Sequence, residues 1–382
     1  MRFVLTCGGS GGHINPALAV ARLLRDEGHE ILFIGAPSGM EGDLVPREGF
    51  AIEFVDVRSL SRSLKPGAVA RNARTVLIVA GALRQAKKIL KGFKPHAVLG
   101  TGGYASFPAL RAAARMKIPV LVHESNAFPG VTTKMAAGRA DAILVGMESC
   151  RAAYKRKERV HVVGTPVRPE FFAADRLRAR EALRLDNRPV VVSIFGSQGA
   201  SDMNRLMLEL MALEDGEWQH IHAAGPKRYG ALVKTAAERG LVFDGATGLR
   251  LTDYIHNMAE ACAAADILIC RAGASTLAEL AAAGKPAVLI PSPNVVADHQ
   301  TANAKMLKEA GGAVVLPEAG LTAEILYGAV KDLLDDYEKR EAMRRSLQKL
   351  AVPDSARRIA DMITAAGRGH LARAGAADGA PL

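Results

Sequence analysis

A strand, a glycine loop and a helix follow one another in residues 2–28, which read "RFVLTCGGSGGHINPALAVARLLRDEG". An apolar run precedes a loop with four glycines, and apolar residues at helical spacing then continue to a closing glycine. The same order returns in residues 188–211, "RPVVVSIFGSQGASDMNRLMLELM". This succession is typical of parallel α/β sheets, in which the loop after a strand binds phosphate at the start of the next helix.

Short apolar runs alternate with helical patterns along the rest of the chain, which predicts parallel strands connected by helices. We expect strands at 2–7, 30–36, 51–57, 96–102, 118–124, 141–146 and 159–164, and again at 188–195, 219–225, 266–273, 286–291 and 312–317. The predicted fold class is therefore α/β, with two Rossmann-like, doubly wound parallel sheets and a ligand cleft between them.

Prolines and a glycine in "GTPVRPEFF", residues 164–172, interrupt this pattern and indicate the domain boundary. We expect an N-terminal domain at 1–164 and a C-terminal domain at 165–365, whose final helix packs back on the N-terminal domain. Residues 366–382 are rich in Ala and Gly without periodicity, so we expect a disordered tail there.

The basic residues are concentrated in one region. The chain has a formal net charge of +11, and 13 Lys and Arg residues lie at 58–117, where no acidic residue occurs. The helix expected at 73–94 carries a short apolar patch between cations, which predicts binding to an anionic membrane surface. A half-buried helix with a solvated basic face is the alternative. No nucleic-acid-binding motif accompanies the charge, so we expect no nucleic acid partner.

Composition also restricts location and cofactors. No run approaches the ~18–20 apolar residues of a membrane-spanning helix, and the first apolar run is too short for a signal peptide. The four cysteines form no CxxC pair and have no histidine at zinc-ligand spacing. We therefore expect a cytosolic protein without disulfides or a metal site.

The first glycine loop does not match the dinucleotide fingerprint, because Ile14 stands where the third glycine belongs. The second expected strand ends in Gly35 and Ala36 and lacks the acidic residue that would bind a ribose. An NAD-dependent oxidoreductase is therefore disfavoured. Asn15 is a good N-cap and Pro16 a good first helical residue, so we expect the loop to bind an anion at that helix start.

The second half offers two similar loops, "FGSQGA" at 195–200 and "CRAGASTLAEL" at 270–280. Both lead from an expected strand into a helix, which favours phosphate binding. Glu279 follows within the first turns of the second helix, where a carboxylate can accept two hydrogen bonds from a ribose diol. A glutamate that complements the helix dipole is the alternative explanation of this residue.

Seven segments taken together resemble the signatures of the MurG family of glycosyltransferase family 28. They are "GGSGGHINPAL" (8–18), "TGGYASFP" (101–108), "HESNAFPG" (123–130), "GTPVRPE" (164–170), "FGSQGA" (195–200), "CRAGASTLAE" (270–279) and "DHQTANA" (298–304). The resemblance extends from residue 2 to about residue 365. It implies the GT-B fold and transfer of N-acetylglucosamine from UDP-GlcNAc to undecaprenyl-pyrophosphoryl-MurNAc-pentapeptide, the lipid I to lipid II step of peptidoglycan biosynthesis.

The resemblance also implies the site residues. UDP-GlcNAc is expected to contact Ser10, Gly11, Gly12, Asn126, Arg168, Ser197, Asn204, Ile255, Arg271, Ala274, Ser275, Thr276, Leu277, Ala278, Glu279, Gln300 and Asn303. Ser197 and the backbone at 274–276 would hold the diphosphate, Glu279 the ribose, and the main chain at Ile255 the uracil. Arg168 and Arg271 would balance the charge of the leaving group, and Gln300 with Asn126 would bind sugar hydroxyls.

On the acceptor side the resemblance implies Tyr104, with His13 as the favoured general base and Glu124 or His123 as alternatives. Two positions depart from the family pattern: Ser10 replaces the usual threonine, and Thr133 stands where many members have asparagine.

An inverting transfer needs a base for the acceptor hydroxyl and a stabilised diphosphate leaving group. The sequence has no D-x-D motif to hold a metal, so helix N-termini and arginines are expected to stabilise the diphosphate, with no metal or cofactor. We expect a peripheral protein at the cytoplasmic face of the cell membrane, in contact with its lipid substrate and with other cell-wall synthesis proteins.

Three other functions are the alternatives. A related GT-B enzyme that glycosylates diacylglycerol or another lipid would share the donor loops. A non-catalytic membrane-recruiting subunit would lack the donor half, and an NAD oxidoreductase would need the missing fingerprint.

Overall fold

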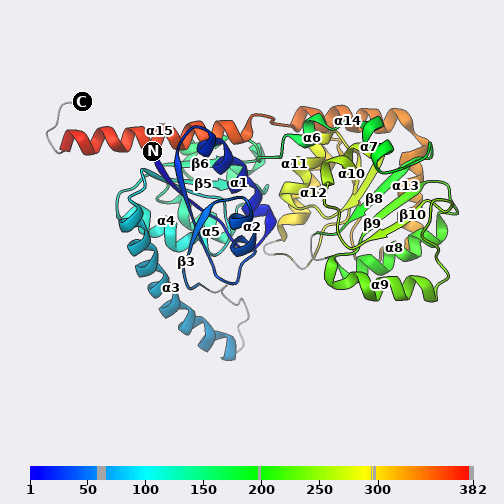
Figure 1. Ribbon diagram of the computed structural model, residues 1–382, viewed down its shortest axis with the longest axis horizontal. Helices are drawn as coiled ribbons and strands as arrows, with labels where there is room; N and C mark the ends of the chain where they lie inside the picture. The colour runs from blue at the N-terminus through cyan, green and yellow to red at the C-terminus, as the bar shows by residue number, and fades with distance from the viewer. Residues whose placement is uncertain (58–65, 197–198, 294, 296–297, 378–382) are drawn as a thin grey trace. The chain divides into compact units, whose positions relative to one another are not determined.

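The computed structural model describes residues 1–57, 66–196, 199–293, 295 and 298–377, with the backbone alone at 66–79 and 374–377. The chain divides into two compact units (Figure 1). The first comprises Met1–Val167 and Asp354–Leu382, and the second comprises Arg168–Pro353. The division at Val167 and Arg168 lies three residues beyond the predicted boundary, and residues 354–365 belong to the first unit.

Among the described residues of the first unit, seven strands form one parallel sheet in the order β3-β2-β1-β4-β5-β6-β7. They are β1 (Arg2–Thr6), β2 (Glu30–Gly35), β3 (Ala51–Phe54), β4 (Ala97–Gly100), β5 (Val120–Glu124), β6 (Ala142–Val145) and β7 (Val160–Val162). Central strands are buried on both faces, as continuous apolar runs require.

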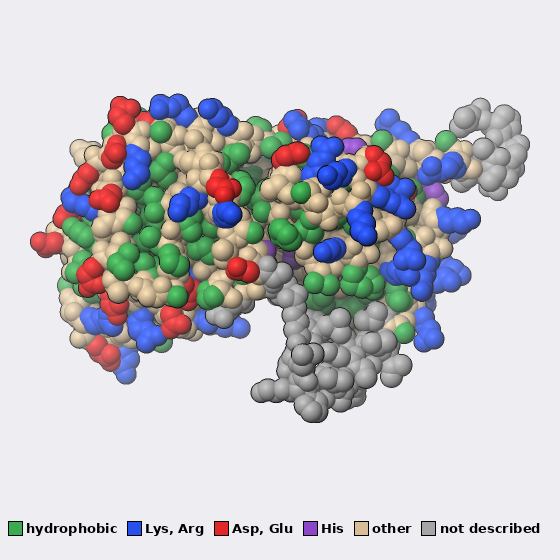
Figure 2. Space-filling model, turned by 180° about the vertical axis from the view of Figure 1, so that it is seen from behind, with side chains coloured by type: hydrophobic (Ala, Val, Ile, Leu, Met, Phe, Trp, Pro, Cys, Tyr) green, Lys and Arg blue, Asp and Glu red, His purple; other side chains and the backbone are tan. Residues whose placement is uncertain are grey.

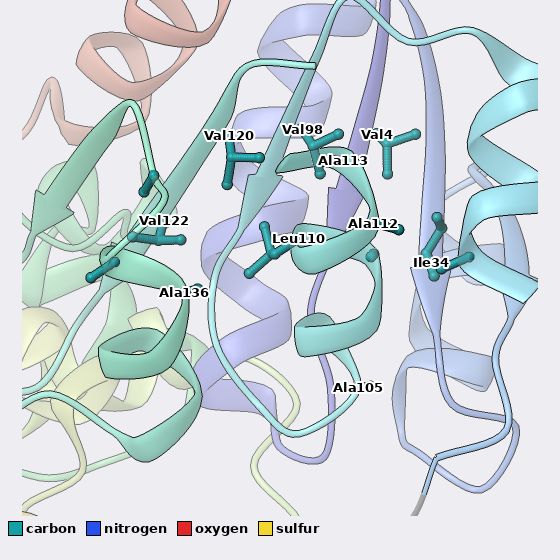
Figure 3. Packing of buried hydrophobic residues seen from close by; sticks show 14 of the residues in the cluster. Val4, Ile34, Val98, Ala105, Leu110, Ala112, Ala113, Val120, Val122 and Ala136 are labelled. Atoms are coloured by element: carbon teal, nitrogen blue, oxygen red, sulfur yellow. The ribbon is translucent and has the colours of Figure 1, made fainter. Parts of the chain in front are cut away.

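Helices cover both faces of this sheet. The helical segments are α1 (Gly11–Asp26), α2 (Glu41–Arg47), α3 (Pro66–Phe93), α4 (Ser106–Arg115), α5 (Val131–Ala137), η1 (Glu148–Ala153), η2 (Lys157–Arg159) and α15 (Ser355–Ala377). One core joins the sheet to α3, α4 and α5, and another joins it to α1 and α15. Figure 3 shows Leu110 of α4 directed at Val98 and Val120 of the sheet. Gly100 permits this approach, since a Cβ there would lie 2.6 Å from Leu110.

In the second unit, six described strands form a parallel sheet in the order β10-β9-β8-β11-β12-β13. The strands are β8 (Val190–Ile194), β9 (Gln219–Ala223), β10 (Leu249–Thr252), β11 (Ile267–Cys270), β12 (Ala287–Leu289) and β13 (Ala313–Val315). The helices are α6 (Glu170–Ala173), α7 (Arg176–Ala182), α8 (Ser201–Leu213), α9 (Pro226–Glu238), α10 (Met258–Ala264), α11 (Ala274–Ala283), α12 (His299–Glu309), α13 (Ala323–Asp335) and α14 (Tyr337–Leu350). Helices α8 and α13 enclose the main core around Trp218.

These two parallel sheets confirm the predicted α/β, Rossmann-like fold. In each unit the strand order reverses beside the first strand, which pairs with both of its neighbours: β1 with β2 and β4, and β8 with β9 and β11. Ligands of such sheets bind at the carboxyl ends of the strands next to this reversal. The three loops predicted to bind an anion follow β1, β8 and β11, so all of them leave the sheets at these points.

The structure corrects the prediction for residues 366–382. Helix α15 continues to Ala377, and only 378–382 lie outside the described residues. Ile359 and Ile363 are buried against α1 and the sheet. Gly367 lets the helix approach further, because a Cβ there would lie 3.0 Å from the ring of Phe3. The small residues that suggested disorder therefore permit close packing at Gly367.

Candidate active site

The first helix begins earlier than the sequence indicated. Helix α1 starts at Gly11 with Ser10 as its extended N-cap residue, and Pro16 lies inside it. The predicted start at Asn15 and Pro16 is therefore wrong. Pro16 stands in the second turn, beyond the first-turn positions at which a missing backbone N–H costs no helical hydrogen bond. The helix N-terminus therefore lies at Ser10, Gly11 and Gly12, and His13 belongs to its first turn.

His13 is fixed between this helix and the loop after β4. Its Nδ1 lies 3.1 Å from the Thr101 carbonyl oxygen and donates to it, while the Thr101 hydroxyl donates to the His13 carbonyl at 2.7 Å. A neutral imidazole that donates from Nδ1 carries its lone pair on Nε2. The geometry therefore gives His13 the tautomer that a general base acting through Nε2 requires.

Two loops meet beside His13 at distances that only glycine permits. A Cβ on Gly103, whose φ is +83°, would lie 2.0 Å from the Gly8 carbonyl oxygen. A Cβ on Gly102 would lie 2.6 Å from His13 Nδ1. The ring of Tyr104, predicted on the acceptor side, lies next to Gly9. The structure therefore brings His13 and Tyr104 to the same end of the sheet.

Sequence reasoning missed Glu41, which supports the first glycine loop. Its carboxylate is fully buried and accepts hydrogen bonds from the backbone amides of Gly9 at 3.1 Å and Ala36 at 2.9 Å. The available signal was an acidic residue between two glycines in "GMEGD", residues 39–43, shortly after an expected strand.

His123 has a structural environment. Its side chain is fully buried, and Nε2 donates to the Gly164 carbonyl oxygen at 2.9 Å. Burial lowers the pKa of His123, and its bond to Gly164 opposes that effect only in part. The ring is therefore a neutral core group.

Glu124 organises the loop that follows β5. One carboxylate oxygen accepts from the backbone and side-chain nitrogens of Asn126, at 3.1 and 2.8 Å, and the other accepts from the Gly130 amide at 2.8 Å. Gly130 is the N-cap residue of α5, so Glu124 links the end of a strand to the start of a helix. Of the three candidate bases, the geometry favours His13.

In the second unit, α11 begins directly at the sequence-predicted phosphate loop, with Gly273 as its N-cap residue. Ala274, Ser275 and Thr276 form its first turn, followed by Leu277 and Ala278. Glu279 lies half-buried one turn further on. Burial raises the pKa of Glu279 to about 7, and the positive charge of Arg168 opposes this increase. The structure therefore places Arg168 and Glu279 close enough to interact.

The two predicted cations differ in their surroundings. The Arg168 guanidinium lies over the ring of Phe171, 5.3 Å from its centroid. Arg271 donates to the Ile290 carbonyl at 3.0 Å and to the Glu318 carboxylate at 2.5 Å. An anionic leaving group would therefore compete with Glu318 for Arg271. The sequence did not indicate that Glu318 is a partner of Arg271.

Gln300 and Asn303 both support loops at the strand ends. Gln300 accepts from the Ser292 amide at 2.8 Å, and Asn303 donates to the Ala272 carbonyl at 3.0 Å. Asn303 is fully buried, so its side chain supports the loop after β11 from behind. Gln300 is only half-buried, which is compatible with the predicted contact to a sugar.

Of the remaining predicted donor contacts, Asn204 is buried in α8 and donates to the Ala224 carbonyl at 2.8 Å. Ile255 is half-buried in the segment after β10. Ser197 lies outside the described residues. The described part of the chain contains no group of His, Cys, Asp or Glu side chains placed to hold a metal ion.

Glycine loops and helix N-termini at both strand reversals define two Rossmann-like units suited to phosphorylated ligands. The glycosyltransferase family 28 N-terminal domain matches residues 3–145, and the family's C-terminal domain matches residues 190–359. The chain therefore belongs to glycosyltransferase family 28, as the seven segments indicated.

Curated relatives match almost the whole chain. One is UDP-N-acetylglucosamine–N-acetylmuramyl-(pentapeptide) pyrophosphoryl-undecaprenol N-acetylglucosamine transferase of Caldanaerobacter subterraneus subsp. tengcongensis, 37% identical over 366 residues, which cover 95% of this chain and 99% of the relative. The protein of the same name from Symbiobacterium thermophilum is 40% identical over 372 residues, which cover 96% of this chain and 97% of the relative.

Solved structures show the same fold. The crystal structure of Acinetobacter baumannii MurG superposes with a TM-score of 0.74 at 28% identity, covering 95% of this chain and 99% of that one. A calicheamicin glycosyltransferase superposes with a TM-score of 0.68 at 18% identity, covering 98% of this chain and 99% of that one. This likeness concerns the fold alone.

Proposed function

We propose that this chain transfers N-acetylglucosamine from UDP-GlcNAc to undecaprenyl-pyrophosphoryl-MurNAc-pentapeptide, converting lipid I to lipid II in peptidoglycan biosynthesis. The observation that carries the proposal is the match to relatives named for this reaction, at 37% and 40% identity over 95% and 96% of the chain. The match includes both units and every segment from which site residues were predicted. The proposal makes the chain a UDP-GlcNAc-dependent hexosyltransferase.

The donor is assigned to the second unit. The N-terminus of α11 and the loop after β8 would bind the diphosphate, since backbone amides and the helix dipole favour an anion there. Glu279 would accept hydrogen bonds from both ribose hydroxyls when it is ionised. The support for this role is its half-buried position one turn after the phosphate loop, with Arg168 near enough to affect its pKa.

The acceptor is assigned to the first unit, with His13 as the general base. In the proposed reaction Nε2 of His13 removes the proton from the acceptor hydroxyl, whose oxygen forms a bond to the anomeric carbon of the sugar. The bond from that carbon to UDP breaks, and UDP departs with the electron pair. A single displacement of this kind inverts the anomeric configuration.

The proposal includes no metal. Stabilisation of the departing diphosphate is assigned to helix N-termini and to Arg168, groups that provide positive potential at fixed positions. Arg271 contributes only if the anion displaces its bond to Glu318.

The protein is proposed to act at the cytoplasmic face of the membrane, bound peripherally through the basic region 58–117. Lys87, Lys88 and Lys91 of α3 are exposed, whereas Ala86 and Leu90 on the same helix are buried in the core. Figure 2 shows Lys and Arg side chains gathered on the first unit along the described end of this helix. The predicted apolar patch is Val76–Leu83, and the side chains of residues 76–79 lie outside the described part of the structure. No described helix is long and apolar enough to cross a membrane.

The test is transfer of radiolabelled sugar from UDP-GlcNAc to two acceptors offered separately: the undecaprenyl-linked muramyl-pentapeptide and diacylglycerol. Label in the first acceptor alone is the expected result. Label in diacylglycerol alone would instead support the related lipid glycosyltransferase considered above.

Two additions to this assay test the finer parts of the proposal. EDTA should leave the rate unchanged, and loss of activity that Mg²⁺ or Mn²⁺ restores would contradict metal-independent transfer. Binding to vesicles should increase with their content of anionic lipid and decrease with salt, because salt screens charge. If vesicle binding depends on neither anionic lipid nor salt, the basic region is only a solvated face and does not bind the membrane.

A further inference from the structure

Five polar side chains are buried together in the core of the second unit. Glu214, His220, His222 and Ser193 are fully buried, and Asn204 is 2% exposed. His220 and His222 alternate along β9 and therefore share one face of the sheet. Ser193 of β8 lies opposite His222 in the strand register. A polar group in such a place is costly unless it is hydrogen-bonded, so the bonds within this cluster determine its structure.

The directions of these bonds follow from one backbone group, the Ala224 carbonyl. A carbonyl can only accept, so Asn204 donates to it from Nδ2, at 2.8 Å. The side-chain oxygen of Asn204 then faces Nε2 of His222 at 3.2 Å and must accept from it. Burial lowers the pKa of His222 to about 3, so the ring is neutral. With the proton on Nε2, Nδ1 is an acceptor, and the Ser193 carbonyl oxygen 3.3 Å from it is a contact without a hydrogen bond.

The remaining members continue the same chain of bonds. The Ser193 hydroxyl lies 2.7 Å from Nδ1 of His222 and donates to it. The hydroxyl oxygen then accepts from Nε2 of His220 at 2.8 Å. Nδ1 of His220 lies 2.6 Å from a carboxylate oxygen of Glu214, so a hydrogen bond joins these two side chains. One continuous chain of hydrogen bonds therefore runs from Glu214 to Ala224.

The Ala224 end of this chain lies against Gly199, which belongs to a glycine loop predicted to bind phosphate. A Cβ on Gly199, whose φ is +65°, would lie 1.9 Å from the Ala224 carbonyl oxygen, so the two backbones are in direct contact. The backbone N–H of Asn204 donates to the Ala200 carbonyl at 2.8 Å, so Asn204 belongs to the first turn of α8, and its side chain joins that turn to Ala224. Movement of the Ala224 carbonyl would therefore displace Gly199 and the first turn of α8.

We propose that Ser193, His220 and Glu214 are positioning residues for the UDP-sugar: through His222 and Asn204 they fix the Ala224 carbonyl, against which Gly199 of the second unit's first glycine loop packs. The proposal rests on the proposed function, since it takes this loop as part of the diphosphate site. None of the three residues touches the donor. They act by holding Gly199 and the first turn of α8 in place, so their loss weakens binding rather than the chemical step.

Ser193→Ala is the central variant, because it removes the hydroxyl at the middle of the chain without adding volume. It removes the acceptor of the His220 Nε2 proton and the donor to Nδ1 of His222, so the bonds that fix both rings relative to each other are lost. We expect the dissociation constant for UDP and the KM for UDP-GlcNAc to rise about tenfold, a change of ~1.4 kcal/mol, with kcat nearly unchanged. Glu214→Gln, which perturbs the far end of the chain, should move both constants in the same direction.

Gln219→Met is the matched control. Gln219 is 2% exposed on the same strand, but its side-chain oxygen accepts from the Asp186 amide at 3.1 Å, away from the glycine loop. This variant also loses buried hydrogen bonds, so it should lower the melting temperature while leaving the UDP dissociation constant unchanged. UDP binding measured by titration calorimetry, together with thermal unfolding, separates a local effect on the loop from general destabilisation.

The outcomes distinguish this proposal from the proposed function. If the unaltered chain does not bind UDP, the proposed function fails and this proposal fails with it. If the unaltered chain binds UDP and both Ser193→Ala and Glu214→Gln bind it equally well, the positioning role alone is overturned. A fall in kcat with no change in KM or in UDP affinity would also overturn it.

Discussion

Glu279 should make donor binding depend on pH in a range where an ordinary glutamate is already ionised. Burial raises its pKa from 4.5 to about 7, against the opposing charge of Arg168. A carboxylate accepts from both ribose hydroxyls only when it is ionised, so only the ionised fraction of the protein binds with full affinity. Between about pH 8 and about pH 6 that fraction falls from about nine-tenths to about one-tenth, so the dissociation constant should rise about tenfold.

The assay is titration calorimetry with UDP-GlcNAc across this pH range at constant ionic strength. UDP-GlcNAc is preferred to UDP because a terminal phosphate itself titrates near about pH 6, whereas the diphosphate diester does not. Glu279→Gln is the control, since its amide can still accept a hydrogen bond but does not titrate. We expect this variant to bind more weakly and with little change over the range.

Stability should change in the opposite direction over part of this range. Between 4.5 and about 7, folded chains hold a proton on Glu279 that unfolded chains have released. The free energy of unfolding contributed by this group therefore decreases as pH rises through that window, and becomes constant above it. Thermal unfolding of the intact chain and of Glu279→Gln measures the difference. Equal pH dependence of donor binding in these two proteins would refute the assigned role of Glu279.

Three further changes test the architecture of the first unit. Glu41→Gln replaces an acceptor of two buried backbone amides with a group that can accept from only one of them. The free energy of unfolding, measured in urea, should fall by about 1–3 kcal/mol, and an unchanged value would show that the loop does not depend on this carboxylate. Ile363→Ala leaves a cavity under α15 and should cost about 2–5 kcal/mol, whereas a cost near zero in the same experiment would mean that α15 is not docked. Gly103→Ala places a Cβ against the Gly8 carbonyl and should reduce kcat/KM for transfer in a protein that remains folded by circular dichroism; full activity would contradict the close contact.

Twelve of the described strands were predicted from short apolar runs. For the central strands the reason is physical, since parallel strands buried on both faces need continuous hydrophobic sequence. Strand β10, Leu249–Thr252, was not predicted. It lies at the edge of its sheet and only Leu249 is buried, so the pattern that identifies a central strand is missing.

Helix boundaries and tertiary packing were harder to predict. The start of α1 was misplaced because Pro16 is a favourable first residue, and local propensity favoured it over the actual start at Gly11. The helical segment 366–377 was missed because nothing local indicates that Gly367 lies against Phe3. The first error arose from competing local signals, and the second from a contact between segments that are far apart in the sequence.

Within the candidate site, the sequence indicated which loops to examine but not what supports them. His13 and Glu279 could be proposed because they lie on glycine loops after strands. Glu41 and the pair His220 and Ser193 lie outside those loops, and their roles depend on bonds that only the folded chain forms. Residues that hold a site in place leave weaker sequence signals than residues on its loops.

The central claim is that the chain transfers N-acetylglucosamine to the lipid-linked muramyl-pentapeptide, with His13 as base and Glu279 at the donor. The most direct measurement is incorporation of radiolabelled sugar into that acceptor by the intact chain, His13→Ala and Glu279→Ala, each with its UDP-GlcNAc dissociation constant. The intact chain should transfer the sugar, His13→Ala should bind the donor while its rate falls about 10²- to 10⁴-fold, and Glu279→Ala should fail to bind it. No label in this acceptor with the intact chain, or an undiminished rate in His13→Ala, would contradict the account.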